Sequence, residues 1–157
     1  MSDANIVHTE VMDLKATPAQ VREFILTPDR ILDYFPQPVE GDVLEPGKAI
    51  FCRGEMGVSM LELLADESND MLVVIKVSTA FGLEGPYTRE RIEENTVFTM
   101  VEDWALEEIE SGTRLTKTWR DVASKGPEPF PIADAVKQGA GHECEPLITG
   151  WNAAAAG

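Results

Sequence analysis

Residues 16–36, which read ATPAQVREFILTPDRILDYFP, decide the fold because they contain the same helix start twice. The Thr17-Pro18 pair is followed by Gln20, a pattern typical of a capping box, in which the threonine and glutamine side chains each satisfy a free backbone N–H. The Thr27-Pro28 pair repeats this start, and Pro36 ends it. The sequence therefore predicts two short helices in tandem. Their apolar residues recur at helical spacing: Val21, Phe24 and Ile25, then Ile31, Leu32 and Phe35.

Strand-like sequence lies on both sides of these helices. Residues 5–15 read as one strand, and Glu45-Pro46-Gly47-Lys48 has the proline and glycine placement of a type II turn. Residues 82–90 read as a loop, which forms either part of the mouth of a binding site or an ordinary surface connection. Further strands are expected over residues 39–44, 49–53, 58–65, 71–81, 96–110 and 113–123, and helices near 132–138 and over 145–156.

This order of elements predicts an α+β fold. One strand, two short helices, six consecutive strands and a last helix give a curved seven-stranded antiparallel sheet, because an antiparallel sheet of this size twists. The C-terminal helix is the only long element available to cover the concave face. The 157 residues suit a single domain over residues 1–157.

The last two strands are predicted to form a hairpin closed by a two-residue turn at Ser111-Gly112. This register places Trp104 opposite Trp119 and Glu102 opposite Asp121, with Lys117 near the far rim of the sheet. Because tryptophans bury the most apolar surface, their face is expected to be the inner one. The candidate ligand-contacting residues are Met100, Trp104, Leu106, Leu115 and Trp119, together with Trp151 on the last helix.

Two chemical interpretations of this hairpin remain open. Glu102 and Asp121 are the candidate catalytic residues, because two carboxyl groups side by side in a cavity acquire different proton affinities and can act as acid and base. The alternative is that both lie in solvent at the rim. Trp104 and Trp119 either stack on a ring of a ligand or simply pack the core.

The charge balance excludes several partners. Thirteen Lys and Arg against 28 Asp and Glu give a net charge of −15. Nucleic acids and anionic membranes need a positive surface, so neither is expected as a partner. The longest apolar run, residues 71–75, is too short to cross a bilayer. The first residues lack the pattern of a signal peptide, so a cytoplasmic location without membrane insertion is expected.

No metal or cofactor site is visible. The cysteines, Cys52 and Cys144, and the histidines, His8 and His142, have no metal-ligand spacing. The cysteines are interpreted as reduced thiols, or as thiols lining a cavity. The sequence contains no nucleophile elbow, phosphate-binding loop or clear catalytic triad. No metal and no cofactor are therefore expected.

The residues already quoted between Ala16 and Gly47 resemble the opening of SRPBCC proteins, the START-like helix-grip superfamily. The segment Gly112-Thr113-Arg114-Leu115-Thr116 resembles the penultimate hairpin of that superfamily. The pair Gly150-Trp151 resembles the closing helix of homologues of chaperone-ATPase activators. This resemblance implies a curved sheet gripping a C-terminal helix, with an apolar cavity between them that binds hydrophobic molecules. No catalytic residue is common to the superfamily, so the resemblance assigns none.

Three functions follow as expectations. The first is binding of a small hydrophobic ligand, such as a lipid, a polyketide or an aromatic metabolite, between the sheet and the last helix. The alternative is a polyketide cyclase or dehydrase that uses Glu102 and Asp121 as acid and base in the same cavity. A third is a protein that interacts with a chaperone.

Overall fold

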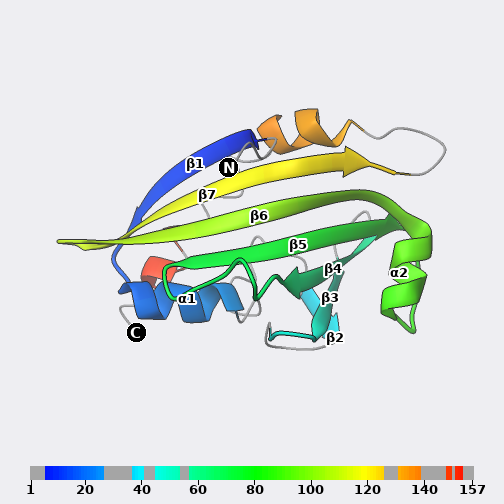
Figure 1. Cartoon of the computed structure of the whole chain (residues 1–157), viewed down its shortest axis with the longest axis horizontal. Coiled ribbons are helices and arrows are strands. Elements are labelled where there is room, and N and C mark those ends of the chain that lie inside the picture. Colours follow the sequence, from blue (N-terminus) through cyan, green and yellow to red (C-terminus); the bar gives the residue numbers. More distant parts are fainter. Residues whose placement is uncertain are drawn as a thin grey trace.

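Seven strands form one antiparallel sheet in the order β1-β7-β6-β5-β4-β3-β2 (Figure 1). The α+β class is confirmed. The computed structural model describes residues 6–26, 37–40, 45–53, 57–125, 131–138, 148–149 and 151–153. The elements are β1 (Ile6–Leu14), α1 (Pro18–Leu26), β2 (Gln37–Glu40), β3 (Ala49–Arg53), β4 (Gly57–Leu63), β5 (Leu72–Phe81), α2 (Arg89–Asn95), β6 (Thr96–Ile109) and β7 (Gly112–Ser124).

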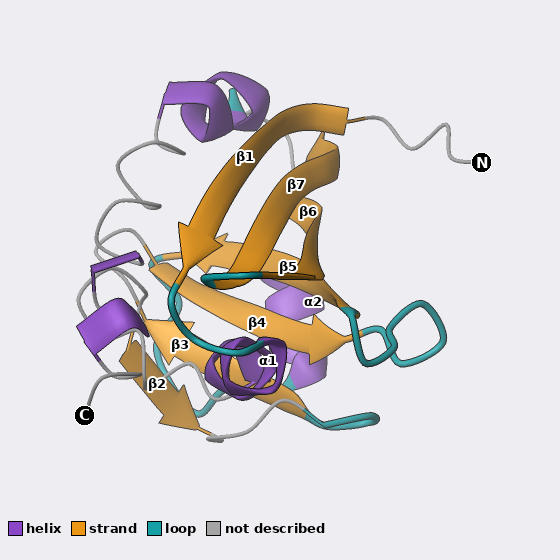
Figure 2. Cartoon of the chain, turned by 90° about the vertical axis from the view of Figure 1, so that its left-hand side faces the viewer, coloured by secondary structure: helices purple, strands orange, loops and turns teal. Residues whose placement is uncertain are grey.

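The sheet is strongly bent. β1, β7 and β6 rise steeply from the plane of β4, β3 and β2 (Figure 2). β2 to β7 follow one another as a meander, and β1 then joins the far side of β7, with Met12 opposite Leu115. The Thr113 hydroxyl donates a hydrogen bond of 2.8 Å to the carbonyl oxygen of Ala16, which fixes the chain where it leaves β1 for α1.

The capping box at α1 is confirmed. The backbone N–H of Gln20 donates to Thr17 Oγ1 at 3.2 Å, and the backbone N–H of Thr17 donates to Gln20 Oε1 at 2.9 Å. The helix buries Val21, Phe24 and Ile25, the residues expected from its apolar spacing. The capping pattern therefore sets the start of α1, and the apolar stripe sets the side that packs on the sheet.

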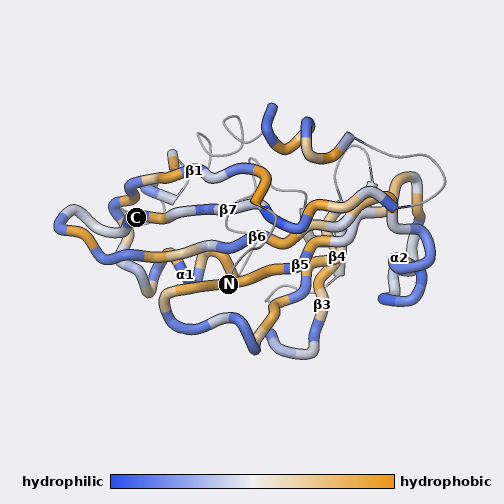
Figure 3. The backbone as a smooth tube through the Cα atoms, turned by 45° about the horizontal axis from the view of Figure 1, so that its top comes forward, coloured by the Kyte–Doolittle hydropathy of each residue, from blue (hydrophilic) through white to orange (hydrophobic). Residues whose placement is uncertain are grey.

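The two faces of the sheet carry separate cores. We call the face that packs against α1 the inner face; its cluster also contains Trp151 and two residues of a helix over 132–138, Ile132 and Val136. The opposite, outer face has a smaller cluster under α2, in which the rings of Phe51 and Tyr87 stack 6.2 Å apart. β5 is hydrophobic over most of its length because it contributes to both cores, whereas α2 is largely hydrophilic (Figure 3).

Two local predictions have different outcomes. The turn at Glu45–Lys48 is confirmed, since these two residues form a β-bridge and Gly47 has a φ of +80°, as a type II turn requires.

The loop predicted over residues 82–90 is wrong at its end, because α2 begins at Arg89. Thr88 caps this helix by accepting a hydrogen bond from the backbone N–H of Arg91 at 3.2 Å. Only Ile92 of α2 is buried, so the helix has almost no apolar stripe to reveal it.

The register of the last hairpin is also wrong by two residues. Ile109 pairs with Gly112, so the turn residues are Glu110 and Ser111. Gly112 lies outside the turn, where β1 approaches its backbone. A Cβ at this position would lie 2.1 Å from the carbonyl oxygen of Leu14, and the φ of Gly112 is +146°. The glycine therefore marks a close approach between strands rather than the turn itself.

Other predicted elements lie wholly or partly outside the described residues. The second tandem helix, expected over 27–36, lies outside them entirely. Of the helix expected over 145–156, the structure describes residues 148–149 and 151–153, which are helical, and the helix over 132–138 is confirmed. No helix among the described residues is long and apolar enough to cross a membrane.

Candidate functional site

The middle of the inner face is a block of four residues from β6 and β7. Trp104 pairs with Lys117, and Glu102 pairs with Trp119, so the two tryptophans lie diagonally rather than opposite each other as predicted. A shift of two residues keeps the side chains on their predicted faces from the turn as far as the pair Val101–Arg120, because side chains alternate along a strand. All six predicted ligand-contacting residues are buried: Met100, Trp104, Leu106, Leu115, Trp119 and Trp151.

Lys117 is the most unusual member of this block. Its exposed fraction is 1%, although it was predicted at the rim. The ammonium nitrogen lies 4.2 Å from the centre of the Trp104 ring and 4.4 Å from that of Trp119. The same nitrogen is 3.7 Å from Glu102 Oε1, and the exposed fraction of Glu102 is 7%. Two aromatic faces and one carboxylate therefore compensate for the loss of water around the charge.

The C-terminal segment completes the aromatic part of the site. The ring of Trp151 lies 6.0 Å from that of Trp104 and 5.6 Å from that of Phe24 on α1. The segment is attached beside the end of β1, where the backbone N–H of Lys15 donates to Asn152 Oδ1 at 2.9 Å. All three tryptophans of the chain thus belong to one group, and we call Trp104, Trp119 and Trp151 the indole cluster.

Two members of the indole cluster have unsatisfied donors. The indole nitrogens of Trp104 and Trp151 are buried, and neither has a hydrogen-bond partner among the residues that the structure describes. A buried donor without a partner costs about 1–3 kcal/mol, so natural proteins rarely retain one without a reason.

Half-buried polar residues of β1 border the cluster. Glu10 pairs with Lys117, and His8 pairs with Trp119 at a ring separation of 5.7 Å. The side chains of His8 and Glu10 are 28% and 31% exposed, and His8 Nε2 donates to Glu10 Oε2 at 2.6 Å. The site is therefore polar and open to water on its β1 side, and aromatic and closed toward α1.

The predicted pairing of Glu102 with Asp121 is wrong. Asp121 follows an irregularity in the β6–β7 ladder, has a φ of +52° and is exposed on the outer side. Its carboxylate accepts a hydrogen bond of 2.8 Å from Arg120 Nη1. Glu102 therefore has Lys117 and Trp119 as neighbours in place of a second carboxyl group, and Asp121 is excluded from the site.

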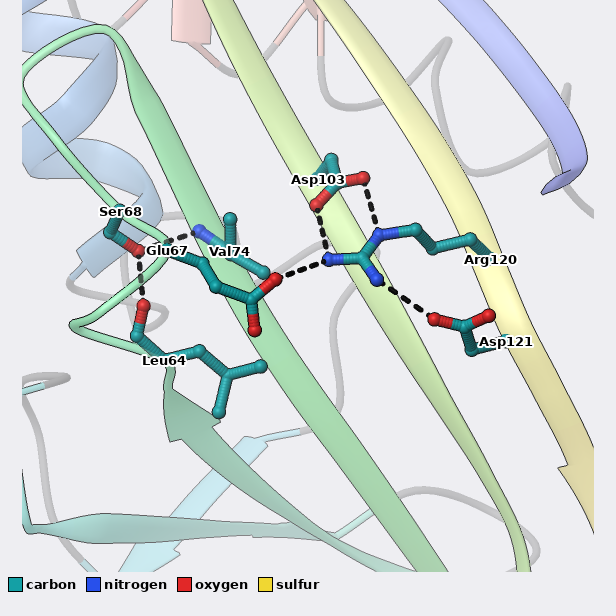
Figure 4. A network of polar contacts seen from close by, with 7 residues as sticks. All are labelled: Leu64, Glu67, Ser68, Val74, Asp103, Arg120 and Asp121. Carbon is teal, nitrogen blue, oxygen red and sulfur yellow. Dashed lines mark hydrogen bonds and ion pairs between the residues drawn. The ribbon is translucent and has the colours of Figure 1, made fainter. Parts of the chain in front are cut away.

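Arg120 organises the outer face opposite the site. Its guanidinium donates to Asp103 through Nε at 2.7 Å and Nη2 at 3.2 Å, and to Glu67 and Asp121 (Figure 4). The hydrogen bonds that Arg120 donates to Asp103 are the main reason that the pKa of Arg120 is raised. The Asp103–Arg120 ion pair joins diagonal neighbours on β6 and β7 rather than residues directly opposite each other.

The remaining candidate groups from the sequence are the two cysteines and His142. Cys52 is a free, buried thiol, and burial raises its pKa to about 12, so it stays protonated near neutral pH. Cys144 and His142 lie outside the described residues. Within the described part of the chain, no three His, Cys, Asp or Glu side chains are arranged to hold a metal ion.

Sequence reasoning missed the polar half of the site. Lys117 is predicted at the rim because a long side chain near the turn can extend its ammonium into water. Its partners are identified only by the observed register. His8 and Glu10 share alternation with Met12 and Leu14, which was the available signal that they face inward. Nothing in the sequence of β1 alone shows that it pairs with β7.

Comparison with known proteins identifies the fold. No family model and no curated protein matches the sequence. Among solved structures, an uncharacterised protein from Rhizobium leguminosarum is similar with a TM-score of 0.64 and 16% identity, over 92% of this chain and 93% of that one. The Aha1 dimer from Colwellia psychrerythraea is similar with a TM-score of 0.60 and 14% identity, over 92% and 94% of the respective chains.

A third similar structure is DynU16, a protein in the dynemicin biosynthetic locus. Its TM-score is 0.59 at 16% identity, and the match covers 95% of this chain and 47% of DynU16. At these identities the likeness concerns the fold alone, which is of the helix-grip type.

Proposed function

We propose that this protein binds a small, largely hydrophobic molecule at the indole cluster, between the inner face of β6 and β7 and the C-terminal segment. The observation that carries the proposal is that Trp104 and Trp119 enclose the buried Lys117, the partner of Glu102, while Trp151 packs against Trp104. Binding sites for small molecules combine such apolar and aromatic surface with a few fixed polar groups. The shared fold with DynU16, from a small-molecule biosynthetic locus, supports this proposal.

Native mass spectrometry of freshly purified protein tests the proposal. We expect a co-purified or added hydrophobic compound to remain bound to the wild-type protein, and the Trp104→Ala variant to lose it. Val11→Ala is the matched control, because Val11 is 59% exposed on the outer side of β1 and touches none of the site. Equal occupancy of the Trp104→Ala and Val11→Ala variants, with both folded by circular dichroism, would contradict the proposed site.

A second candidate function is acid–base catalysis on the bound molecule. The observation that favours it is the buried carboxylate of Glu102, 3.7 Å from the Lys117 ammonium and beside the Trp119 ring. In a cyclisation or dehydration, Glu102 would move the proton while Lys117 stabilises the carboxylate form. Asp121 has no part in this scheme.

Mass analysis after incubation separates the two candidates. The catalytic candidate requires the bound compound to change in mass or retention over time with wild-type protein and to remain unchanged with Glu102→Gln. A compound that is released unaltered by both proteins would leave binding as the function.

A further inference from the structure

The buried indole nitrogens of Trp104 and Trp151 indicate the chemical class of the ligand, an inference that rests on the proposed function. We infer that the site takes an uncharged, flat, apolar molecule with a carbonyl oxygen, which accepts a hydrogen bond from one or both indole N–H groups. Both donors are buried without partners in the described part of the chain, and their rings are only 6.0 Å apart.

An acceptor is required because an indole nitrogen can only donate. A ligand without an acceptor leaves both donors unsatisfied, whereas a carbonyl oxygen relieves a penalty that the protein already carries. The preference for a flat molecule follows from the surrounding aromatic rings. The centre of the Trp151 ring lies 5.6 Å from that of Phe24 and 6.0 Å from that of Trp104.

The charge of the site favours a neutral ligand. The positive charge of Lys117 is already matched by Glu102 at 3.7 Å, and Glu10 lies opposite Lys117 on β1. An anionic ligand would bring an additional negative charge near the buried Glu102 carboxylate and the half-buried Glu10 carboxylate. These charges therefore predict that a ketone binds more tightly than a carboxylate of the same shape.

Three naphthalene probes of similar size test the inference by isothermal titration calorimetry. They are 2-acetylnaphthalene, with a carbonyl oxygen, 2-isopropylnaphthalene, without an acceptor, and 2-naphthoate, with a charge. We expect 2-acetylnaphthalene to bind about tenfold more tightly than 2-isopropylnaphthalene, the gain from one recovered hydrogen bond. We expect 2-naphthoate to bind more weakly than 2-acetylnaphthalene.

Tryptophan-to-phenylalanine variants locate the donor, because phenylalanine keeps a ring and lacks the N–H. The tenfold preference should fall to near one in Trp104→Phe, in Trp151→Phe, or in both, while 2-isopropylnaphthalene still binds and so reports a folded site. Trp119→Phe is the matched control, because it removes an indole of the same cluster. The Trp119 nitrogen is not among the buried donors that lack a partner, so the preference for 2-acetylnaphthalene should persist in this variant.

The outcomes separate this inference from the proposed function. Binding of both neutral probes with equal affinity, or a preference that survives in both Trp104→Phe and Trp151→Phe, overturns the inference and leaves hydrophobic binding intact; a buried water would then satisfy the donors. Tightest binding of 2-naphthoate overturns the assignment of a neutral ligand. No binding of any probe overturns the proposed function and the inference together.

Discussion

Lys117 is the most deeply buried charged residue in the part of the chain that the structure describes. Its ammonium is enclosed by two indole rings and lies 3.7 Å from the Glu102 carboxylate. Removing one member of a buried ion pair typically costs about 3–5 kcal/mol, because the other charge stays buried without compensation. We therefore expect Lys117→Met to lower the free energy of unfolding by this amount, measured by urea denaturation.

Neutralising both partners tests the reason for that loss. The double variant Glu102→Gln, Lys117→Met removes both charges, so it should regain a large part of the stability that the single variant loses. Lys125→Met provides the control, because Lys125 is exposed and a surface change of this kind stays within about 0.5 kcal/mol. If the double variant is no more stable than the single variant, the pair is not electrostatically coupled.

Cys52 gives the protein a specific alkaline sensitivity. Burial raises its pKa from 9.0 to about 12, so above pH 9 the thiol ionises in the unfolded chain but not in the folded one. The folded state then binds more protons, and stability falls as pH rises, by about 1.4 kcal/mol per pH unit. Between pH 8 and pH 10.5, wild-type protein should lose about 2 kcal/mol more unfolding free energy than Cys52→Ala. Equal losses in urea denaturation would refute this account.

At the scale of elements, α1 depends on its first turn. Thr17 and Gln20 exchange two hydrogen bonds there, and an alanine at an N-cap typically costs about 1 kcal/mol. We expect Thr17→Ala to lower the urea midpoint accordingly. Thr17→Ser keeps the hydroxyl and should retain most of the stability, so equal losses in the two variants would show that the methyl group, rather than the cap, matters.

The same elements show what a sequence can and cannot predict. The capping residues of α1 are local, and so is the turn at Glu45–Lys48, and both were predictable from neighbouring residues. The hairpin register was not, because Gly112 is required by β1, which lies a hundred residues away in the chain and whose Leu14 carbonyl leaves no room for a Cβ. α2 was missed because one buried residue, Ile92, does not make a periodic pattern.

The candidate site was only partly predictable from the sequence, because alternation along a strand is local whereas the pairing between strands is not. Alternation along β6 and β7 placed both tryptophans on the inner face, and it survived a two-residue error in register. The identity of each residue's neighbours did not survive, so Asp121 was wrongly joined to Glu102 and Lys117 was wrongly placed at a rim. Contacts between strands depend on register, whereas burial depends only on parity.

At the scale of the whole molecule, the net charge of −15 opposes folding. Compaction brings like charges together, and salt weakens this repulsion because the screening length falls from about 30 Å at 0.01 M to about 8 Å at 0.15 M. We expect the free energy of unfolding to rise between 10 and 200 mM NaCl in urea denaturation.

A less acidic variant provides the comparison. Glu110→Lys changes an exposed turn residue and lowers the excess negative charge by two, so its stability should rise less steeply with salt than that of the wild type. A fall in wild-type stability with added NaCl would instead mean that attractive ion pairs, such as those of Arg120, outweigh the general repulsion.

The hydrogen bonds of Arg120 also affect where an inserted tag or module would be tolerated. Glu67 belongs to the β4–β5 turn, and its hydrogen bond to Arg120 on β7 holds that turn down across the outer face. An affinity tag or fluorescent module inserted there would pull this turn away from the sheet. The tip of the β6–β7 hairpin at Glu110 and Ser111 projects beyond the other strands (Figure 1) and is exposed, which makes it the better place to engineer a handle for immobilisation.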